Sequence, residues 1–216
     1  MKVTLTIDNG PEPRVTPYVL DELAKRDVKA VFFIIAAKLA DPLHRAVALR
    51  AHAEGHVVAN HSHHHRMQLG EYATGEEAVS EISRAEEALQ RLGIGHKLFR
   101  PFAGMGRISA DLLHPAAVEY MREAGMTCVL WNSVPRDWEN TTGWDTILAR
   151  DIATRDWSVP VIHDFDNGAM KRLPHFLDAA IDAGASFTTN FPQECIIVDR
   201  GTSRPDISRY TKSIRD

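Results

Sequence analysis

Apolar and polar positions alternate in a pattern that predicts strands and helices in turn along most of the chain. Short runs of apolar or β-branched residues, typical of buried strands, occur at residues 2–7, 30–35, 56–58, 97–99, 127–131, 159–162 and 185–188. Helical spacing and helix-start signals predict helices at residues 16–24, 41–55, 74–92, 116–124, 144–154 and 173–183. In the second of these helices, the expected buried face consists of Leu43, Ala46, Val47 and Ala53. Repeated βα units indicate a mostly parallel sheet covered by helices, either open or closed as a barrel.

Length and composition favour one globular domain. The 216 residues are 44% hydrophobic and contain no evident linker, so we expect one domain over residues 1–199 and a polar tail over residues 200–216. Cys128 lies in an apolar run and is expected to be buried rather than in a disulfide. A net charge of −4 without a basic stripe argues against nucleic acid as a partner. Without a membrane-spanning run or a secretory leader, we expect no membrane partner and a cytoplasmic location.

Side chains capable of chemistry follow the predicted strands. They are Asp8, Asn9, the histidine-rich segment at residues 61–65, Arg100, Asp137 and His163. Because active sites of parallel α/β folds lie at the carboxyl ends of the strands, a barrel would gather these groups at one rim.

The segment His61-Ser62-His63-His64-His65 is the first candidate for a metal site. Imidazole is a common metal ligand near neutral pH, and His61 and His65 would converge on one ion if the segment made a helical turn. Simpler interpretations stay open from these residues alone. A histidine-rich segment is also typical of a solvated loop or of incidental metal binding, and Asp8-Asn9-Gly10 is also an ordinary turn.

Five segments across nearly the whole domain resemble the motifs of one family, the polysaccharide deacetylases of the NodB-homology, carbohydrate esterase family 4 type. Residues 6–11, TIDNGP, are similar to the family's T-F-D-D-G-P, and residues 61–65 to its H-[ST]-x-x-H. Residues 99–104, FRPFAG, are similar to its R-P-P-Y-G segment, Asp137-Trp138 to its D-W element, and residues 161–163, VIH, to its L-x-H element. The resemblance implies a distorted (β/α)7 barrel of the α/β class. It also implies hydrolysis of an N-acetyl group through a metal-bound water.

The resemblance implies catalytic roles for four residues. Asp8 would be the general base and Arg100 the partner that orients it. His163 would be the general acid, and Asp137 would tune it. These roles agree with the chemistry, because amide hydrolysis needs a base to activate water, an electrophile for the developing oxyanion and an acid to protonate the leaving amine.

The same resemblance implies a divalent metal held by His61, His65 and Asn9. Zinc is expected, with cobalt or nickel as alternatives, because imidazole suits borderline-soft ions. Asn9 stands where the family has its second aspartate, so a neutral amide replaces a charged ligand and weakens the attraction for a dication. An amide oxygen can still coordinate. His63 and His64 could in principle compensate, but they occupy variable positions of the motif and are expected at the surface or behind the ligands.

The substrate wall is expected to depart from the family pattern. Phe102 and Ala103 replace proline and tyrosine, so the backbone N–H of the oxyanion hole is retained at Ala103 while the phenol ring is lost. Trp138 is expected to pack as part of the same wall.

A hydrolase of non-peptide C–N bonds, acting on a small N-acetylated sugar or an oligosaccharide, is therefore the first functional hypothesis. Two alternatives stay open. Asn9 also suits an amide or cyclic imide hydrolase of the allantoinase type, with an altered metal or none, and a non-catalytic barrel could bind carbohydrate. The joint presence of the four catalytic candidates and both histidines favours catalysis, because a decayed site would lose several of these groups.

Overall fold

The computed structural model describes residues 1–213, which fall into two compact units. The single domain expected over residues 1–199 stays a prediction. The first unit consists of Met1–Ile34, Lys38–Val58 and Trp131–Pro192, and the second of Ile35–Ala37, Ala59–Leu130 and the chain from Gln193 onward. No linker marks this division in the sequence, because the chain passes from one unit to the other within β4 (Val57–Asn60) and directly between neighbouring elements. The last three residues of the predicted tail, 214–216, lie outside the described residues.

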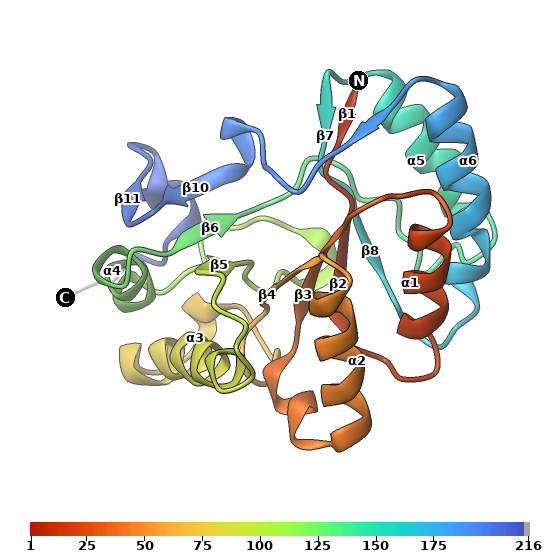
Figure 1. Ribbon diagram of the computed structural model, residues 1–216. Coiled ribbons are helices and arrows are strands. Elements are labelled where there is room, and N and C mark those ends of the chain that lie inside the picture. The colour runs from red at the N-terminus through yellow and green to blue at the C-terminus, as the bar shows by residue number, and fades with distance from the viewer. Residues whose placement is uncertain (214–216) are drawn as a thin grey trace. The chain divides into compact units, whose positions relative to one another are not determined.

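Short parallel strands form the centre of the first unit. They are β1 (Lys2–Val3), β2 (Thr6–Gly10), β3 (Val31–Ile34), β7 (Trp157–Ser158), β8 (Val161–His163) and β9 (Ser186–Phe187). Strand β2 pairs with β3 and β8, and β1 pairs with β7 and β9 (Figure 1). The strand predicted at residues 2–7 is therefore two strands, because the chain changes pairing partners at the buried residues Thr4 and Leu5.

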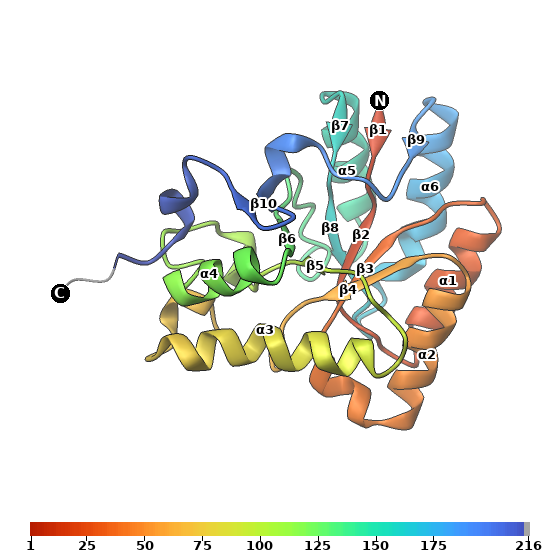
Figure 2. The same ribbon diagram turned by 60° about the vertical axis from the view of Figure 1, so that its left-hand side comes forward.

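Helices cover the strands of the first unit. They are α1 (Thr16–Ala24), α2 (Pro42–Ala53), α5 (Trp144–Ala153) and α6 (Leu173–Asp182), with the short 3₁₀ segment η4 (Ala169–Arg172). A second 3₁₀ segment, η1 (Ala36–Ala40), has residues in both units. Helix α5 packs on α6, and α1 packs on both α6 and α2 (Figure 2). All four were predicted, with ends that differ by one or two residues, because proline, capping and apolar spacing are local signals.

Helix α2 buries a different face from the one predicted. Its buried residues are Ala48 and Ala51, whereas Leu43 is 68% exposed. The guanidinium of Arg50 on this helix bonds to the carboxylate of Asp21 on α1, so polar contacts fix α2 as well as apolar burial. The prediction of Leu43, Ala46, Val47 and Ala53 as the inward face was wrong.

The strands of the second unit are partly parallel and partly antiparallel. They are β5 (Leu98–Phe99), β6 (Thr127–Val129), β10 (Ile196–Asp199) and β11 (Thr202–Ser203). Asn60 of β4 pairs in parallel with β5, which pairs in parallel with β6, while β10 is antiparallel to both β6 and β11. Cys128 is buried in β6, as predicted. Strands β10 and β11 were not predicted, and β11 lies inside the segment that was expected to be a polar tail.

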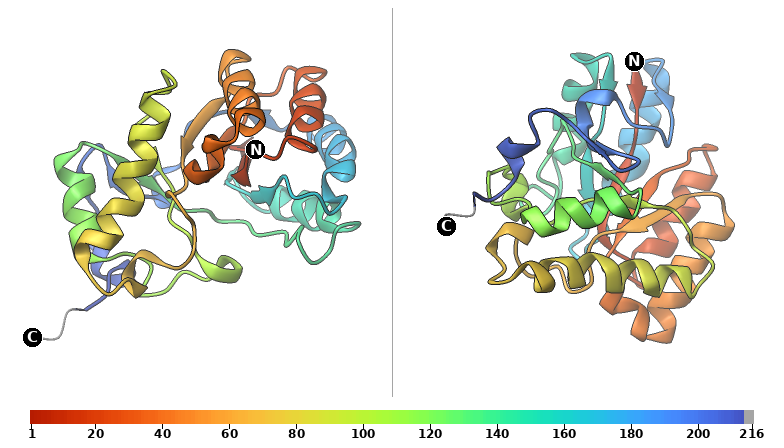
Figure 3. Two further views of the ribbon diagram at one scale, coloured as in Figure 1. Left: turned by 90° about the horizontal axis from the view of Figure 1, so that it is seen from below. Right: turned by 90° about the vertical axis from the view of Figure 1, so that its left-hand side faces the viewer.

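Helices α3 (Gly75–Gln90) and α4 (Pro115–Glu123) lie side by side in the second unit (Figure 3). The predicted capping box of α3 is confirmed, since Thr74 Oγ1 accepts the Glu77 N–H at 3.2 Å and Glu77 Oε2 accepts the Thr74 N–H at 3.1 Å. The 3₁₀ segments of this unit are η2 (Leu69–Glu71), η3 (Gly104–Gly106), η5 (Gln193–Cys195) and η6 (Ile207–Tyr210). Across residues 1–213, no helix has both the length and the apolar character needed to cross a bilayer.

Candidate active site

In the first unit, the carboxyl ends of β2 and β8 bring Asp8 and His163 together. The two residues are register partners on adjacent parallel strands, so their side chains face the same side of the sheet. Asp8 is 3% exposed and His163 is 9% exposed, so both groups lie in an environment that holds little water. Strand pairing therefore places the predicted base beside the predicted acid.

Asp137 fixes the orientation of His163. One carboxylate oxygen of Asp137 accepts the backbone N–H of His163 at 2.8 Å, and the other lies 2.9 Å from His163 Nδ1. A carboxylate accepts hydrogen bonds, so Nδ1 carries a hydrogen and Nε2 is the nitrogen that can exchange a proton with a substrate. Burial lowers the pKa of His163, but the hydrogen bond and charge of Asp137, with the charges of Asp8 and Asp164, outweigh burial and raise it above 6.5.

Two aromatic rings enclose the His163 imidazole. Phe165 stacks on it with ring centroids 4.9 Å apart, and Trp138 meets it edge-on at 5.1 Å. The guanidinium of Arg136 lies over the Trp138 ring, 5.6 Å from its centroid. Trp138 therefore lies beside the proposed acid, and its predicted contact with substrate stays a prediction.

Sequence reasoning missed the part played by Asp164, the residue after His163. Asp164 is buried and accepts a hydrogen bond from the Thr16 hydroxyl. Burial raises the pKa of Asp164 to about 6, although the Thr16 hydrogen bond and the charge of Lys38 lower it. A Cβ atom at Gly10 would lie 2.6 Å from Asp164 Oδ2, so glycine is needed there. The sequence signal for this carboxyl was its position at a strand end, but its partners come from distant segments.

Asn9 has the backbone conformation that asparagine tolerates better than most residues, with φ at 72°. The Lys38 ammonium donates to its backbone carbonyl at 2.7 Å. Its side-chain oxygen Oδ1 is buried and has no hydrogen-bond partner among residues 1–213. Because a buried polar atom is costly when it is left unpaired, this oxygen is suited to accept a ligand such as a cation.

In the second unit, residues 61–65 form an irregular loop, which we call the histidine loop. The segment does not form the helical turn under which His61 and His65 would converge: it is irregular, and Ser62 and His65 have positive φ angles of 66° and 57°. The rings of His61 and His65 nevertheless meet, with centroids 4.3 Å apart. His61 Nδ1 lies 2.8 Å from the Arg100 carbonyl oxygen, which can only accept, so the Nδ1 of His61 carries the hydrogen and its lone pair is on Nε2.

The predicted residues that follow β5 lie close to this loop. Arg100 is completely buried, and its Nη2 donates to the Leu130 carbonyl at 3.1 Å. The Phe102 ring meets the His65 ring edge-on, with centroids 4.5 Å apart. Ala103 follows Phe102 and accepts the Gly106 N–H at 3.0 Å as η3 begins. The roles predicted for Arg100 toward Asp8, and for Phe102 and Ala103 toward substrate, stay predictions.

Glu81 on α3 is a second residue that sequence reasoning missed. Its carboxylate accepts the backbone N–H of His64 at 2.8 Å and lies 2.6 Å from His64 Nδ1. Burial would raise the pKa of Glu81, but hydrogen bonds from His64 and from the backbone N–H of His65 outweigh burial and lower it. His64 therefore supports the loop from behind, which is one of the two places expected for it.

The donor set fits a divalent transition metal. His61 and His65 supply imidazoles from one loop of the second unit. Asn9, in the first unit, has an unpartnered amide oxygen, and its part in the same metal site stays a prediction. Over residues 1–213, no three His, Cys, Asp or Glu side chains cluster in a way that could hold an ion. The amide of Asn9 is thus the third donor that the sequence pattern offers, in place of a carboxylate.

Comparison with known proteins gives the family. A family model described as polysaccharide deacetylase matches residues 1–129. The chain is 32% identical over 168 residues to a chitooligosaccharide deacetylase from Rhizobium leguminosarum bv. trifolii, which covers 75% of this chain and 71% of that protein. It is 31% identical over 198 residues to a peptidoglycan-N-acetylglucosamine deacetylase from Bacillus cereus, which covers 87% of this chain and 66% of that protein.

Solved structures agree. A family 4 carbohydrate esterase from Streptomyces lividans, in complex with acetate, superposes with a TM-score of 0.74 at 26% identity, covering 92% of this chain and 97% of that one. The chain therefore belongs to the polysaccharide deacetylase family. The fold class predicted from the motifs, the α/β fold of these esterases, is confirmed.

Proposed function

We propose that this protein hydrolyses the amide of an N-acetylated sugar or short oligosaccharide and releases acetate. The observation that carries the proposal is the arrangement of Asp8, His163 and Asp137 in the first unit of a member of this family. The names of the two curated relatives, deacetylases of chitooligosaccharides and of peptidoglycan N-acetylglucosamine, support the substrate class.

Asp8 and His163 would divide the proton transfers between them. Asp8 takes a proton from the attacking water, the water oxygen bonds to the carbonyl carbon, and the C–N bond breaks. His163 gives the proton on Nε2 to the leaving amine, so acetate and a free amino sugar are the products. Asp137 stabilises the imidazolium form of His163 and holds its ring in place. The raised pKa of His163 favours the protonated form of this acid.

His61, His65 and Asn9 would hold a divalent ion, with zinc, cobalt or nickel as candidates. When bound, such an ion polarises the amide carbonyl and lowers the pKa of water. The Nδ1 hydrogen bond from His61 to the Arg100 carbonyl orients the lone pair of this ligand. A neutral oxygen at Asn9 gives weaker binding than a carboxylate would.

The test is acetate release from N-acetylglucosamine oligomers by the zinc-loaded protein. We expect release by the wild-type protein, and its loss in Asp8→Asn. His44→Ala is the matched histidine control, since His44 lies on α2 and pairs with Asp41 at the start of that helix. Equal release by the wild-type protein and Asp8→Asn would overturn the proposal.

Asn9 favours a second candidate, hydrolysis of a cyclic amide or imide. A neutral residue beside Asp8 leaves that base without a neighbouring carboxylate, and the unpartnered Asn9 oxygen could accept a substrate N–H as well as a cation. Incubation of the metal-free protein with allantoin separates the candidates. Ring opening without metal, together with no acetate release from the sugars, would favour the second.

A further inference from the structure

The backbone conformation of the histidine loop is not favoured by the residues of the loop themselves. Ser62 and His65 both lie in the left-handed region, where residues other than glycine are rare. Such a conformation persists only where surrounding groups fix it. The position of the His65 ring relative to His61 therefore depends on contacts from outside the loop.

Helix α3 fixes the loop at both ends. At its start, the Asn60 side chain donates to the Ile82 carbonyl at 2.9 Å and accepts the Ser62 N–H at 2.8 Å. At its end, Glu81 accepts the His64 N–H at 2.8 Å with one oxygen and lies 2.6 Å from His64 Nδ1 with the other. Adjacent residues of one helix thus anchor the two ends of the loop.

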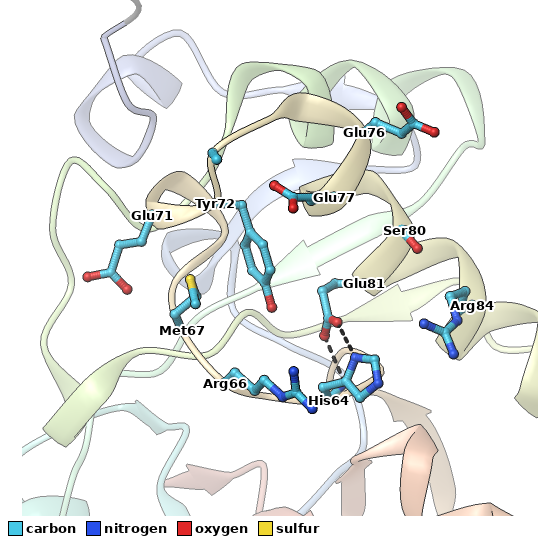
Figure 4. A pocket seen from close by; sticks show the side chains of 11 residues that line it. His64, Arg66, Met67, Glu71, Tyr72, Glu76, Glu77, Ser80, Glu81 and Arg84 are labelled. Carbon is cyan, nitrogen blue, oxygen red and sulfur yellow. Dashed lines mark hydrogen bonds and ion pairs between the residues drawn. The ribbon is translucent and has the colours of Figure 1, made fainter.

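Glu81 bonds to the histidine loop, whereas the neighbouring carboxylates of Glu71 and Glu77 bond to the starts of helical segments. It lines a pocket of about 620 Å3 in the second unit, together with Glu71 and Glu77 (Figure 4). Glu71 bonds to the Gln68 N–H and Glu77 to the Thr74 N–H, so both serve to begin their own helical segments. Glu81 is only 5% exposed and points from α3 to the loop.

We propose that Glu81 is a positioning residue for the histidine loop, which sets the orientation of the His65 ring and thereby the affinity of His61 and His65 for a transition metal. The inference rests on the metal ligands of the proposed function. Glu81 acts through the backbone N–H and the ring of His64, the residue that directly precedes His65. Groups that orient metal ligands in this way commonly change metal affinity by about 10- to 100-fold when they are removed.

The test is calorimetric titration of the metal-free full chain with zinc. Glu81→Ala should weaken zinc binding by about tenfold or more, because the end of the loop loses its acceptor. Glu81→Gln keeps an acceptor oxygen and should recover much of the affinity. Glu77→Gln is the matched control, since it removes a charge from the same pocket without touching the loop, and should bind zinc as the wild-type protein does.

Wild-type zinc affinity in a folded Glu81→Ala variant would overturn the inference, and so would a wild-type protein that binds no zinc. If circular dichroism shows that Glu81→Ala does not fold, the zinc affinities of Glu81→Gln and His64→Ala test the inference instead. Each removes part of the Glu81 contact, and unchanged zinc affinity in both overturns the inference. A wild-type protein that binds zinc through His61 but releases no acetate refutes the proposed function alone, because the affinity measurement needs no substrate.

Discussion

The two units hold their candidate residues in different ways. In the first unit, Asp8 and His163 are register partners on neighbouring strands, and Asp137 binds the backbone and the ring of His163. In the second unit, His61 and His65 lie on an irregular loop. The Glu81 side chain and the Ile82 carbonyl of α3, together with the backbone N–H groups of Ala36 and Ala37, hold this loop in place. Strand pairing fixes side-chain direction through many backbone bonds, whereas the loop depends on a few bonds.

Because the two units hold their candidate residues differently, we expect mutations in them to have different effects. Removal of a group from the first unit should change the chemistry while the neighbouring strands stay in place. Changes around the loop of the second unit should mainly alter affinity for a metal, because the ligands can shift. The predictions below test this contrast.

The largest effect is expected at the acid and base. Asp8→Asn and His163→Ala should each lower kcat by about a hundredfold or more, the usual scale for a positioned proton-transfer group. Zinc affinity should be little changed by His163→Ala. Steady-state acetate release and calorimetric zinc titration provide the two readouts. A His163→Ala variant that keeps near-normal kcat would refute the acid role.

Asp137→Asn should give the next largest effect, a loss of about tenfold or more in kcat with a changed pH profile. The hydrogen bond and charge of Asp137 raise the pKa of His163 against the opposing effect of burial. Without that charge, the opposing effect of burial is larger, so the pKa of His163 falls and the alkaline limb of the kcat profile moves to lower pH. Asp182→Asn, an exposed change on α6, is the control. An unmoved alkaline limb would mean that Asp137 does not tune His163.

Sequence predicted the first unit better than the second for a physical reason. Asp8 and His163 follow apolar runs that end in turn residues, so local pattern was enough to place both at strand ends. The sequence did not indicate the backbone conformation of the histidine loop, because this conformation depends on distant contacts, among them those with Glu81 and Ile82 of α3, about twenty positions along the chain. The motif indicated that the rings of His61 and His65 could meet, but it did not indicate the backbone conformation of the loop between them.

The same dependence on distant contacts explains why the raised pKa of Asp164 and the buried face of α2 were not predicted. The Asp164 partner Thr16 is remote in sequence, so nothing local indicated a buried carboxyl with a raised pKa. On α2, apolar residues at helical spacing suggested an inward face, but the contact with α1 uses small alanines and the Arg50 ion pair. Tertiary contacts decided both cases.

Asn9→Asp sharpens the comparison, because it changes a proposed metal ligand that lies on a strand of the first unit. In a deacetylase with a weakened metal site, the new carboxylate should tighten zinc binding by about tenfold and raise acetate release. In a metal-independent hydrolase, the new carboxylate would instead repel the charge on Asp8 and lower native activity. Zinc titration and both hydrolysis assays in this variant separate the two outcomes. If neither binding nor hydrolysis changes, Asn9 has no part in the site.

The smallest effect is expected for Asp164→Asn, and it concerns stability. Burial raises the pKa of Asp164 from 3.8 to about 6 in the folded protein, so folding binds this proton more tightly than the unfolded chain does. The resulting stabilisation is fully present below the unfolded pKa and is lost as pH rises through the folded pKa. Near neutral pH the folded state therefore holds a buried carboxylate that would be better hydrated when unfolded.

Asparagine keeps the shape of this side chain and an oxygen that can accept the Thr16 hydroxyl. Asp164→Asn should therefore raise the melting temperature at about pH 7 by on the order of 5 °C, with a much smaller gain near pH 4. Asp166→Asn is the control, since that carboxylate is half-exposed and pairs with Arg14. A gain equal at both pH values would mean that packing, not ionisation, sets the effect. A lower melting temperature at about pH 7 would show that the charge of Asp164 stabilises the end of β2. The strands of the first unit would then depend on single contacts, as the histidine loop does.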